Sequence, residues 1–434
     1  MDTQIRFIDL FAGIGGMRLG LEQSLKENNI DFQCVFTSEI KPHAISVYKE
    51  NFPNSEIFGN ITQISSQKIP DFDMLLAGFP CQPFSSAGKQ LGFEDTRGTL
   101  FFEIARILKD KKPNYFLLEN VDNLLIHNLS KKDKKNGEIM GDTLKTILNV
   151  LTDLGYNVSW KILPASDFGV AQIRKRLYIA GSADTIINLD NFNKTYKTFG
   201  DIQEKGLPCI ENDFSKKIFS FLDKNSLPSS YLYDKSIRDK RGGDNNLHSW
   251  YLELRGETNT NQCELLEKMV TERRKKDLAK KKGVPIKDGV GLDIDELKKI
   301  YNGDNFSADI DDLLTKGYLK KYQINTYSKP LYDIVCGRLS FPYTKFLDPD
   351  KLALTLVATD IIHTGVVDGN GIRNLTISEC LKLNGFPENF VINVPYRQAL
   401  DLLGNTVVVP VIKNICDRFF TLQDKGDINE KKKI

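Results

Sequence analysis

Short apolar runs alternate with amphipathic stretches along roughly the first 185 residues of the chain. The apolar runs lie at 5–11, 34–39, 73–78, 115–120 and 176–181, and the stretches expected to form helices lie at 17–28, 41–51, 99–110 and 142–154. Buried strands that alternate with amphipathic helices are typical of a parallel sheet. The pattern therefore predicts an α/β fold with a doubly wound, mostly parallel sheet, whose ligands bind at the carboxyl ends of the strands.

The pattern changes after Gly181. From about 190 to 350 the sequence is richer in Lys, Asn, Asp and Ser, with weak periodicity and scattered Gly and Pro, which indicates a second, less regular domain. Periodicity returns at 375–385, and 407–420 is expected to form a closing helix. Because 434 residues exceed the usual size of one domain, we expect a first domain at 1–188, a second at 189–370 and a last segment at 371–434.

Composition is that of an ordinary globular protein, with 41% hydrophobic and 27% charged residues. No run of about 18 apolar residues is evident, so no membrane-spanning helix is expected, and the first strand begins too early for a signal peptide. Seven scattered cysteines without a CxxC pair favour a reducing cytoplasm, and we expect no metal site. The net charge of +2 neither supports nor excludes nucleic-acid binding, because binding needs only a local basic patch. The best candidate for such a patch is 273–282, which could equally be a solvated helix face.

A glycine-rich turn follows the first strand, in the sequence DLFAGIGG at 9–16. Gly13, Gly15 and Gly16 let the backbone turn tightly and approach a ligand closely. Glu39 ends the next strand, where a carboxylate can accept hydrogen bonds from a ribose diol. Glycine turns close many α/β units, but the two features together predict a cofactor that contains adenosine.

A cysteine stands directly after a proline at the end of a buried strand, in GFPCQPFS at 78–85. Open α/β sheets carry out their chemistry at this end of the strands. The alternative is a small buried hydrophobic residue, which is the usual state of a free cysteine. Pro80 and Pro83 stiffen the turn around Cys81, and a long polar loop follows. Both features favour a reactive cysteine.

Two further strand ends carry charged residues. Glu119 lies in ENV at 119–121, where burial can raise the pKa of a carboxyl group enough for it to stay protonated and donate a hydrogen bond. In QIRKR at 172–176, strand alternation puts Gln172, Arg174 and Arg176 on one face. Two guanidiniums there suggest an anionic or carbonyl-rich ligand. The alternatives are an acid paired with a basic neighbour and an ordinary charged strand end.

Taken together and in this order, the motifs resemble the DNA cytosine-5 methyltransferase family, in particular the bacterial enzymes of type II restriction–modification systems. The resemblance rests on DLFAGIGG, Glu39, GFPCQPFS, ENV, QIRKR, RNLTISECLKLNGFP (373–387) and LLGNTVVVP (402–410). It covers about 1–181 and 371–420. It implies a Rossmann-like methyltransferase fold that uses S-adenosylmethionine, and a target-recognition role for the second domain.

The resemblance also implies a covalent mechanism. Cys81 attacks C6 of cytosine, Glu119 hydrogen-bonds at N3 and the exocyclic amine, Arg176 holds the O2 carbonyl, and Arg174 supports the site. C5 then takes the methyl group, and loss of the C5 proton expels Cys81. None of this can occur inside stacked DNA, so the base must be flipped out.

For the cofactor, the resemblance implies a pocket for S-adenosylmethionine, with S-adenosylhomocysteine as the product. The residues assigned to this pocket are Phe11, Gly13, Gly15, Gly16, Glu39, Ile40, Asn60, Ile61, Pro80, Leu100, Asn405 and Thr406. The last two imply that the chain returns to the first domain after the second, and Thr406 is a candidate N-cap of the closing helix. Asn60 departs from the family, which usually has Asp there, so a hydrogen-bond acceptor is kept but a charge is lost.

For DNA, Gln82, Ser85 and Arg97 belong to the loop that closes over the flipped base, and Arg273, Arg274 and Lys275 are candidates for phosphate contacts. The stretches 241–250 and 335–348 look similar to those of enzymes that modify GGYRCC-type palindromes. Trp250 and His248 are expected to be core residues. The partners implied are double-stranded DNA and, genetically, a cognate restriction endonuclease. We expect a monomer in the cytoplasm.

Three other functions are compatible with parts of the sequence. A tRNA cytosine-5 methyltransferase shares the scaffold, but the long 190–350 segment favours duplex DNA. A DNA-binding regulator without activity would not need Cys81, Glu119 and Arg176. A nucleotide-dependent oxidoreductase would be expected to carry the GxGxxG spacing of a dinucleotide site, which the glycine turn lacks.

Overall fold

The computed structural model describes residues 4–80, 100–129, 139–233, 235–285, 289–335, 341–358 and 360–420. The chain folds into two compact units. The first unit is Met1–Gln203, Pro349–Ile361 and Thr376–Ile434, and the second is Glu204–Asp348 and Ile362–Leu375. The boundaries between the two units therefore lie at 203 and 375, whereas the sequence predicts 188 and 370. In addition, the chain visits the first unit once more, at 349–361.

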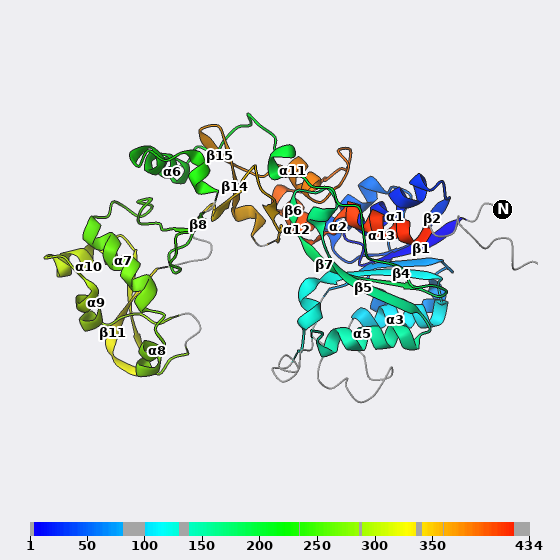
Figure 1. Ribbon diagram of the computed structural model, residues 1–434, viewed down its shortest axis with the longest axis horizontal. Coiled ribbons are helices and arrows are strands. Elements are labelled where there is room, and N and C mark those ends of the chain that lie inside the picture. The colour runs from blue at the N-terminus through cyan, green and yellow to red at the C-terminus, as the bar shows by residue number, and fades with distance from the viewer. Residues whose placement is uncertain are drawn as a thin grey trace, which may run out of the picture. The chain divides into compact units, whose positions relative to one another are not determined.

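A six-stranded sheet forms the centre of the first unit (Figure 1). Its order is β2 (Phe32–Ser38), β1 (Ile5–Leu10), β3 (Met74–Gly78), β4 (Tyr115–Val121), β7 (Lys175–Ser182) and β5 (Asn157–Pro164). The first four strands are parallel, whereas β7 is antiparallel to both β4 and β5. The doubly wound, mostly parallel sheet predicted from the sequence is confirmed, with one reversed strand that the pattern did not reveal.

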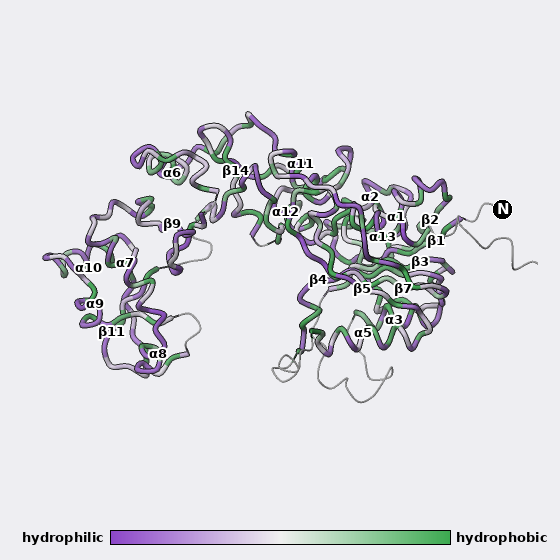
Figure 2. The backbone as a smooth tube through the Cα atoms, viewed as in Figure 1, coloured by the Kyte–Doolittle hydropathy of each residue, from purple (hydrophilic) through white to green (hydrophobic). Residues whose placement is uncertain are grey.

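Each strand of this sheet faces two apolar layers. Along β1 and β3, Phe7 and Leu76 belong to one hydrophobic cluster, while the adjoining residues Ile8 and Leu75 belong to the other. The first cluster is covered by α1 (Gly16–Glu27) and α13 (Val409–Phe420), and the second by α3 (Leu100–Lys111) and α5 (Asp142–Asp153). This burial on both faces explains why the runs 74–77 and 116–118 are continuously apolar in sequence; Figure 2 colours each residue of the chain by its hydropathy.

The predicted helices of this unit are confirmed within a residue or so. They are α1, α2 (Pro42–Asn51), α3 and α5. Elements that were not predicted include β5, α12 (Tyr396–Asn405) and the two-residue strands β6 (Gln172–Ile173) and β13 (Ala353–Leu354). The closing helix α13 packs on α1, where the Ser24 hydroxyl donates to Asp417 at 2.7 Å, so the end of the described chain does return to the first unit.

Within the described residues, Tyr396–Phe420 is long and apolar enough, by length and composition alone, to cross a membrane. The sequence analysis overlooked this stretch. It consists of two helices, α12 and α13, separated at 406–408, and 72% of its most apolar window is buried inside the protein. The stretch is therefore a core element of the first unit.

The second unit contains a small sheet, a helical cluster and a hairpin. The sheet order is β15 (Gly371–Asn374), β14 (Thr364–Asp368), β12 (Lys345–Phe346), β8 (Ser236–Ile237) and β9 (Asn246–Leu247). The helices are α6 (Asp213–Lys224), α7 (Thr260–Glu272), α8 (Lys276–Lys282), α9 (Ile294–Ile300) and α10 (Phe306–Thr315), and β10 (Leu319–Ile324) pairs with β11 (Tyr327–Ile334). Trp250 is fully buried and stacks on His248 at 4.2 Å, which confirms that both are core residues.

Candidate active site

A cavity of about 370 Å³ lies at the carboxyl ends of the parallel strands of the first unit. This is the edge at which open α/β sheets bind ligands. Residues that follow β1, β2, β3 and β4 line it, together with residues of the returning C-terminal segment. The lining residues are Phe11, Gly13, Ile14, Ser38, Glu39, Ile40, Lys41, Ala44, Asn60, Ile61, Gly78, Phe79, Pro80, Leu100, Glu119, Asn120, Val121, Arg174, Arg176, Leu402, Gly404, Asn405 and Thr406.

The carboxylate of Glu39 fixes the turn after β1 to the end of β2. Its Oε2 accepts a hydrogen bond from the Gly13 amide at 2.7 Å, and its Oε1 accepts from the amides of Ile40 and Lys41 at 2.7 and 2.9 Å. Three amide donors hold the side chain in one orientation at the cavity wall. Phe11 reaches the cavity from a left-handed backbone conformation, with φ of 54°, which is uncommon for a residue with a side chain.

Gly15 and Gly16 are not among the residues that line this cavity, and their assignment to the cofactor site stays a prediction. Gly15 has φ of 87°, and a Cβ atom there would lie 2.4 Å from the Phe52 ring. A Cβ atom on Gly16 would lie 2.8 Å from the Val407 side chain. Both glycines are therefore required because the chain packs closely around the turn, at Gly16 also against the cavity-lining residue Thr406.

A carboxyl group and a guanidinium form a pair inside the cavity. Glu119, at the end of β4, lies beside Arg176 of β7, with 3.1 Å between Oε1 and Nε. The antiparallel register of these strands brings Val121 opposite Arg176, which places the two side chains at the same end of the sheet. Burial raises the pKa of the Glu119 carboxyl above its usual value, while the guanidiniums of Arg176 and Arg174 act in the opposite direction. The pair can thus present both a protonated carboxyl and a cation to one polar ligand.

Asn120, the residue next to Glu119, fixes the backbone that precedes Cys81 in the sequence. The Asn120 side chain donates to the Phe79 carbonyl at 2.9 Å, and its own oxygen accepts from the Val121 amide at 2.8 Å. Phe79 and Pro80 therefore lie against the end of β4, on the cavity wall. Cys81 itself lies outside the described residues, as do Gln82, Ser85 and Arg97.

Asn60 lies on the cavity wall, but its side chain also caps a short helix. The Asn60 oxygen accepts from the amide and the hydroxyl of Thr62 at 3.1 and 3.0 Å. Ile61 and Leu100 contribute apolar surface beside it, each at the start of a helix. The oxygen of the Asn60 side chain is thus already engaged within the protein.

The returning segment supplies the opposite wall. Asn405 ends α12, and its side chain donates to the Asp401 carbonyl and carboxylate at 2.9 and 3.0 Å. Thr406 follows as the C-cap of α12. The prediction that Thr406 is the N-cap of the closing helix was wrong, because α13 begins only at Val409.

Some cavity residues were missed from the sequence, although a signal was present. Ser38, Gly78 and Val121 each end or follow a predicted buried strand, in the same position as Glu39 and Glu119. The general rule that ligands bind at strand ends would have found them. Leu402 and Gly404 could not be found in this way, because they lie in the helix that was not predicted.

The basic run at 273–282 is largely engaged inside the second unit. Arg273 is 2% exposed, and its guanidinium forms a two-point ion pair with Asp333, at 2.8 and 3.2 Å. It therefore does not fit the predicted role of contacting DNA phosphates. Arg274 donates to the Lys240 carbonyl at 3.0 Å, and Lys275 pairs with Glu272 at an exposed position. The Lys275 side chain is 59% exposed.

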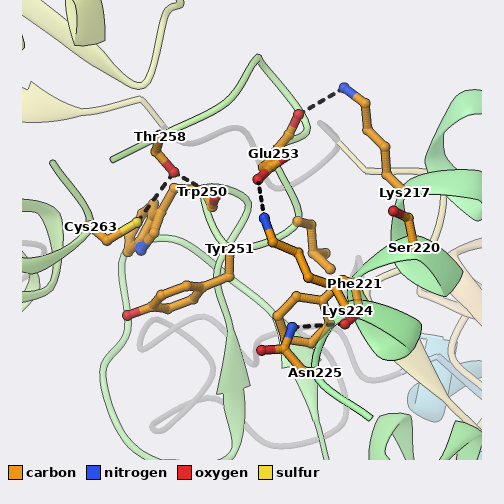
Figure 3. Close-up of a pocket in the computed structure, with 11 residues that line it drawn as sticks. Lys217, Ser220, Phe221, Lys224, Asn225, Trp250, Tyr251, Glu253, Thr258 and Cys263 are labelled. Atoms are coloured by element: carbon orange, nitrogen blue, oxygen red, sulfur yellow. Dashed lines mark hydrogen bonds and ion pairs between the residues drawn. The ribbon is translucent and has the colours of Figure 1, made fainter. Parts of the chain in front are cut away.

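A second, smaller cavity of about 210 Å³ lies in the second unit (Figure 3). Lys217, Lys224 and Glu253 lie on one side of it, and Trp250 and Tyr251 on the other. The two lysines contact Glu253, one at its carbonyl and one at its carboxylate, at 2.7 and 3.3 Å. Glu253 thus pairs with Lys224, while Lys217 is held by a backbone carbonyl.

Known proteins provide a comparison for this arrangement. A family model described as C-5 cytosine-specific DNA methylase matches residues 5–421. The chain is 46% identical over 425 residues to the type II methyltransferase M.NlaIV of Neisseria lactamica, a match that covers 96% of this chain and 98% of the relative. It is 39% identical over 449 residues to the type II methyltransferase M.BanI of Aneurinibacillus aneurinilyticus, covering 98% and 97%.

Solved structures share the fold at low sequence identity. The methyltransferase EhMeth of Entamoeba histolytica aligns with a TM-score of 0.51 and 18% identity, over 98% of this chain and 100% of that one. A protein encoded within prophage Cp- of E. coli, described as a DNA modification methyltransferase, aligns with a TM-score of 0.51 and 19% identity, over 97% and 100%. The family match over nearly the whole chain and the full-length type II relatives show that the chain belongs to the C-5 cytosine-specific DNA methylases and is a DNA cytosine-5 methyltransferase of a type II restriction–modification system.

Proposed function

We propose that this enzyme transfers a methyl group from S-adenosylmethionine to C5 of one cytosine within a specific double-stranded DNA sequence, through a covalent bond to Cys81. The observation that carries the proposal is that one cavity contains both the Glu119–Arg176 pair and the wall fixed by Glu39. A polar pair suited to a pyrimidine ring and a pocket suited to an adenosine group thus open into the same space.

The cavity fits the cofactor in size and in the chemistry of its lining. Its volume falls in the range of about 300–1,000 Å³ that is usual for small-molecule sites. The Glu39 carboxylate is buried at the cavity wall and held in one orientation by backbone amides. In this orientation it can accept hydrogen bonds from a ribose diol. Phe11, Ile61 and Leu100 offer apolar surface for a base, and Asn60 offers a polar edge. When bound, S-adenosylmethionine supplies an electrophilic methyl group from its sulfonium.

Catalysis in this proposal begins with the Cys81 thiolate. The thiolate forms a bond to C6 of cytosine, and the electron pair of the C5–C6 double bond moves toward the N3 and O2 edge of the ring. Glu119, whose pKa is raised by burial, hydrogen-bonds at N3, and Arg176 donates to O2. Both contacts stabilise the charge that the addition creates on the ring.

The activated ring then exchanges the proton on C5 for the methyl group. C5 would then form a bond to the methyl carbon of bound S-adenosylmethionine, which would supply the methyl group and be released as S-adenosylhomocysteine. A base removes the proton from C5, the C5–C6 double bond re-forms, and the Cys81 thiolate leaves. The cytosine must be rotated out of the helix for Cys81 to reach C6, and its unstacking costs a few kcal/mol, about what is typical of base flipping.

The second unit is proposed to recognise the DNA sequence. A GGYRCC-type palindrome remains the prediction, on the sequence stretches named above. Methylation there would protect host DNA from a cognate restriction endonuclease, and we propose that the enzyme acts as a monomer in the cytoplasm. Bisulfite sequencing of DNA from cells that express the chain would give both the target and the methylated cytosine. Methylation confined to a sequence unrelated to GGYRCC would refute the proposed target alone.

Methyl transfer from labelled S-adenosylmethionine tests the reaction directly. We expect incorporation into duplex DNA and none into tRNA, and we expect Cys81→Ser to abolish incorporation while binding of S-adenosylhomocysteine is kept. The hydroxyl of serine is a much poorer nucleophile than a thiolate at neutral pH, so no covalent addition to C6 follows. Cys209→Ser is a matched control, because Cys209 lies in the second unit away from this cavity. Full activity of Cys81→Ser would refute the covalent mechanism.

A further inference from the structure

The QIRKR segment joins parts of the first unit that lie far apart in the sequence. β6 (Gln172–Ile173) pairs in parallel with β13 (Ala353–Leu354), which belongs to the segment where the chain first returns from the second unit. The buried side chain of Gln172 accepts a hydrogen bond from the Leu356 amide at 3.0 Å and donates to the Leu383 carbonyl at 2.9 Å. The motif thus binds two segments that both come after the second unit.

Arg174 extends this arrangement to the cavity wall. The side chain is 2% exposed, and its Nη1 donates to the carbonyls of Leu356 and Gly404 at 3.0 and 3.2 Å. Its Nη2 donates to the Thr406 carbonyl at 2.5 Å. Burial lowers the pKa of Arg174 to about 10, which still leaves the guanidinium charged at neutral pH. A cation that faces three carbonyls holds them more strongly than neutral donors would.

Two of the three carbonyls that Arg174 binds belong to the wall of the cofactor cavity. Gly404 and Thr406 both line the cavity. Gly404 also packs directly on the first returning segment, since a Cβ atom there would lie 2.5 Å from the Ala358 nitrogen and 2.7 Å from its Cα. The position of this wall therefore depends on two contacts, the guanidinium on one side and the Ala358 backbone on the other.

We infer that Arg174 is a positioning residue, whose guanidinium fixes the 404–406 wall of the cofactor cavity to the strand region that carries Arg176. This makes specific the expectation that Arg174 supports the site beside Arg176. Its two terminal nitrogens are engaged with backbone carbonyls, and among the described residues only its Nε–H is left without a partner. The inference rests on the proposed function, because it takes the cavity to be the S-adenosylmethionine site.

Binding of S-adenosylhomocysteine in the absence of DNA, measured by titration calorimetry, separates the two roles. Arg174→Met keeps the length of the side chain but removes the donors, so the wall loses its anchor and we expect the Kd to rise by about tenfold or more. Arg174→Lys should recover part of the affinity, because one ammonium cannot match the planar fork of the guanidinium. Lys175→Met is the matched control, since Lys175 is the adjacent exposed residue, and its Kd should equal that of the wild type.

Steady-state kinetics on DNA provide the second measurement. Arg174→Met should raise the KM for S-adenosylmethionine while kcat at saturating cofactor stays within about threefold of the wild type. Arg176→Met should show the opposite, with a large fall in kcat and little change in the Kd for S-adenosylhomocysteine. Should Arg174→Met behave like Arg176→Met, with unchanged cofactor affinity, Arg174 acts on the base and the inference is overturned.

A second variant moves the same wall without touching the arginine. Gly404→Ala places a methyl group against the Ala358 backbone, so we expect a weaker affinity for S-adenosylhomocysteine even if Arg174→Met fails to fold. Wild-type affinity in Gly404→Ala would overturn the inference. A wild-type enzyme that binds no S-adenosylhomocysteine at all would instead refute the proposed function, and the inference with it.

Discussion

The carboxyl group of Asp9 lies inside the first unit, near the end of β1. It is 1% exposed, and its Oδ2 accepts a hydrogen bond from the Tyr48 hydroxyl at 3.2 Å, while its Oδ1 accepts none within the described part of the chain. Burial raises the pKa of Asp9 to about 8, and the nearby Arg18 guanidinium opposes this only in part. Asp9 therefore keeps its proton in the folded protein at a pH where the unfolded chain has lost it.

The stability of the protein should therefore depend on whether Asp9 carries this proton. A folded-state pKa raised from 3.8 to about 8 means that the contribution to stability is fully present below about pH 4 and is lost as the pH rises toward 8. We expect the free energy of unfolding to fall across that range, with a slope of up to about 1.4 kcal/mol per pH unit from this group. Urea denaturation at several pH values measures it.

Asp9→Asn should flatten that part of the profile, because the amide does not titrate. The exposed Asp153→Asn serves as the control and should leave the slope as it is. A slope that persists unchanged in Asp9→Asn would show that another group is responsible.

Arg273 shows how a charge can support the second unit without contacting DNA. Removing one member of a buried ion pair leaves the other charge uncompensated, which costs about 3–5 kcal/mol. Arg273→Met should therefore lower the stability of the second unit by an amount of that order, measured by urea denaturation, because Asp333 loses its main partner. Lys275→Met, at the exposed end of the same run, should leave stability within about 0.5 kcal/mol of the wild type. Equal stabilities for the two variants would contradict the structural role of Arg273.

The turn between β1 and α1 depends on glycine for two separate reasons. Gly15 has φ of 87°, and a Cβ atom there would also overlap the Phe52 ring. Gly155 has a similar φ of 93° but open space around it. Gly15→Ala should therefore destabilise the protein by more than Gly155→Ala, whose cost is limited to the backbone strain of about 1–3 kcal/mol. Thermal or urea unfolding of the two variants gives the difference, and equal losses would show that Phe52 simply moves aside.

At the scale of helices and strands, much of the first unit could be predicted from the sequence. The strands buried on both faces are continuously apolar and the helices that cover them are amphipathic, so local patterns were sufficient. β5 was missed because it is an edge strand, paired only with β7 and half-buried along most of its length. α12 was missed as well, and Thr406 was consequently assigned to the wrong helix.

In the candidate site, too, some features could be predicted from the sequence and others could not. Strand-end positions such as Glu39 and Glu119 could be found by rule, whereas the partners of Arg174 and Arg273 could not. Arg174 binds carbonyls more than 180 residues away in the sequence, and Arg273 is neutralised by Asp333, 60 residues away. Local charge density reveals a cluster of basic residues but does not reveal which of them are buried against a distant acid.

The reaction of the whole enzyme with DNA allows a further test. Duplex DNA that carries 5-fluorocytosine at the target should trap a covalent complex, since fluorine at C5 cannot leave as the proton does and Cys81 is not released. Mass spectrometry of the digested complex should place the adduct on Cys81, and Cys81→Ser should give none. A confirmed target sequence that yields methylated product but no adduct with the fluorinated base would argue strongly against covalent catalysis.

The path of the chain between the two units has a consequence for biosynthesis. The helix α13, which covers one face of the central sheet, is made only after the entire second unit has left the ribosome. Until then Phe7, Met17 and Leu21 lack the apolar partners that bury them, and the 404–406 wall of the cofactor cavity does not yet exist. A partly translated chain should therefore be dependent on chaperones and catalytically silent. An unfinished chain that ends before residue 404 should therefore be unable to methylate DNA.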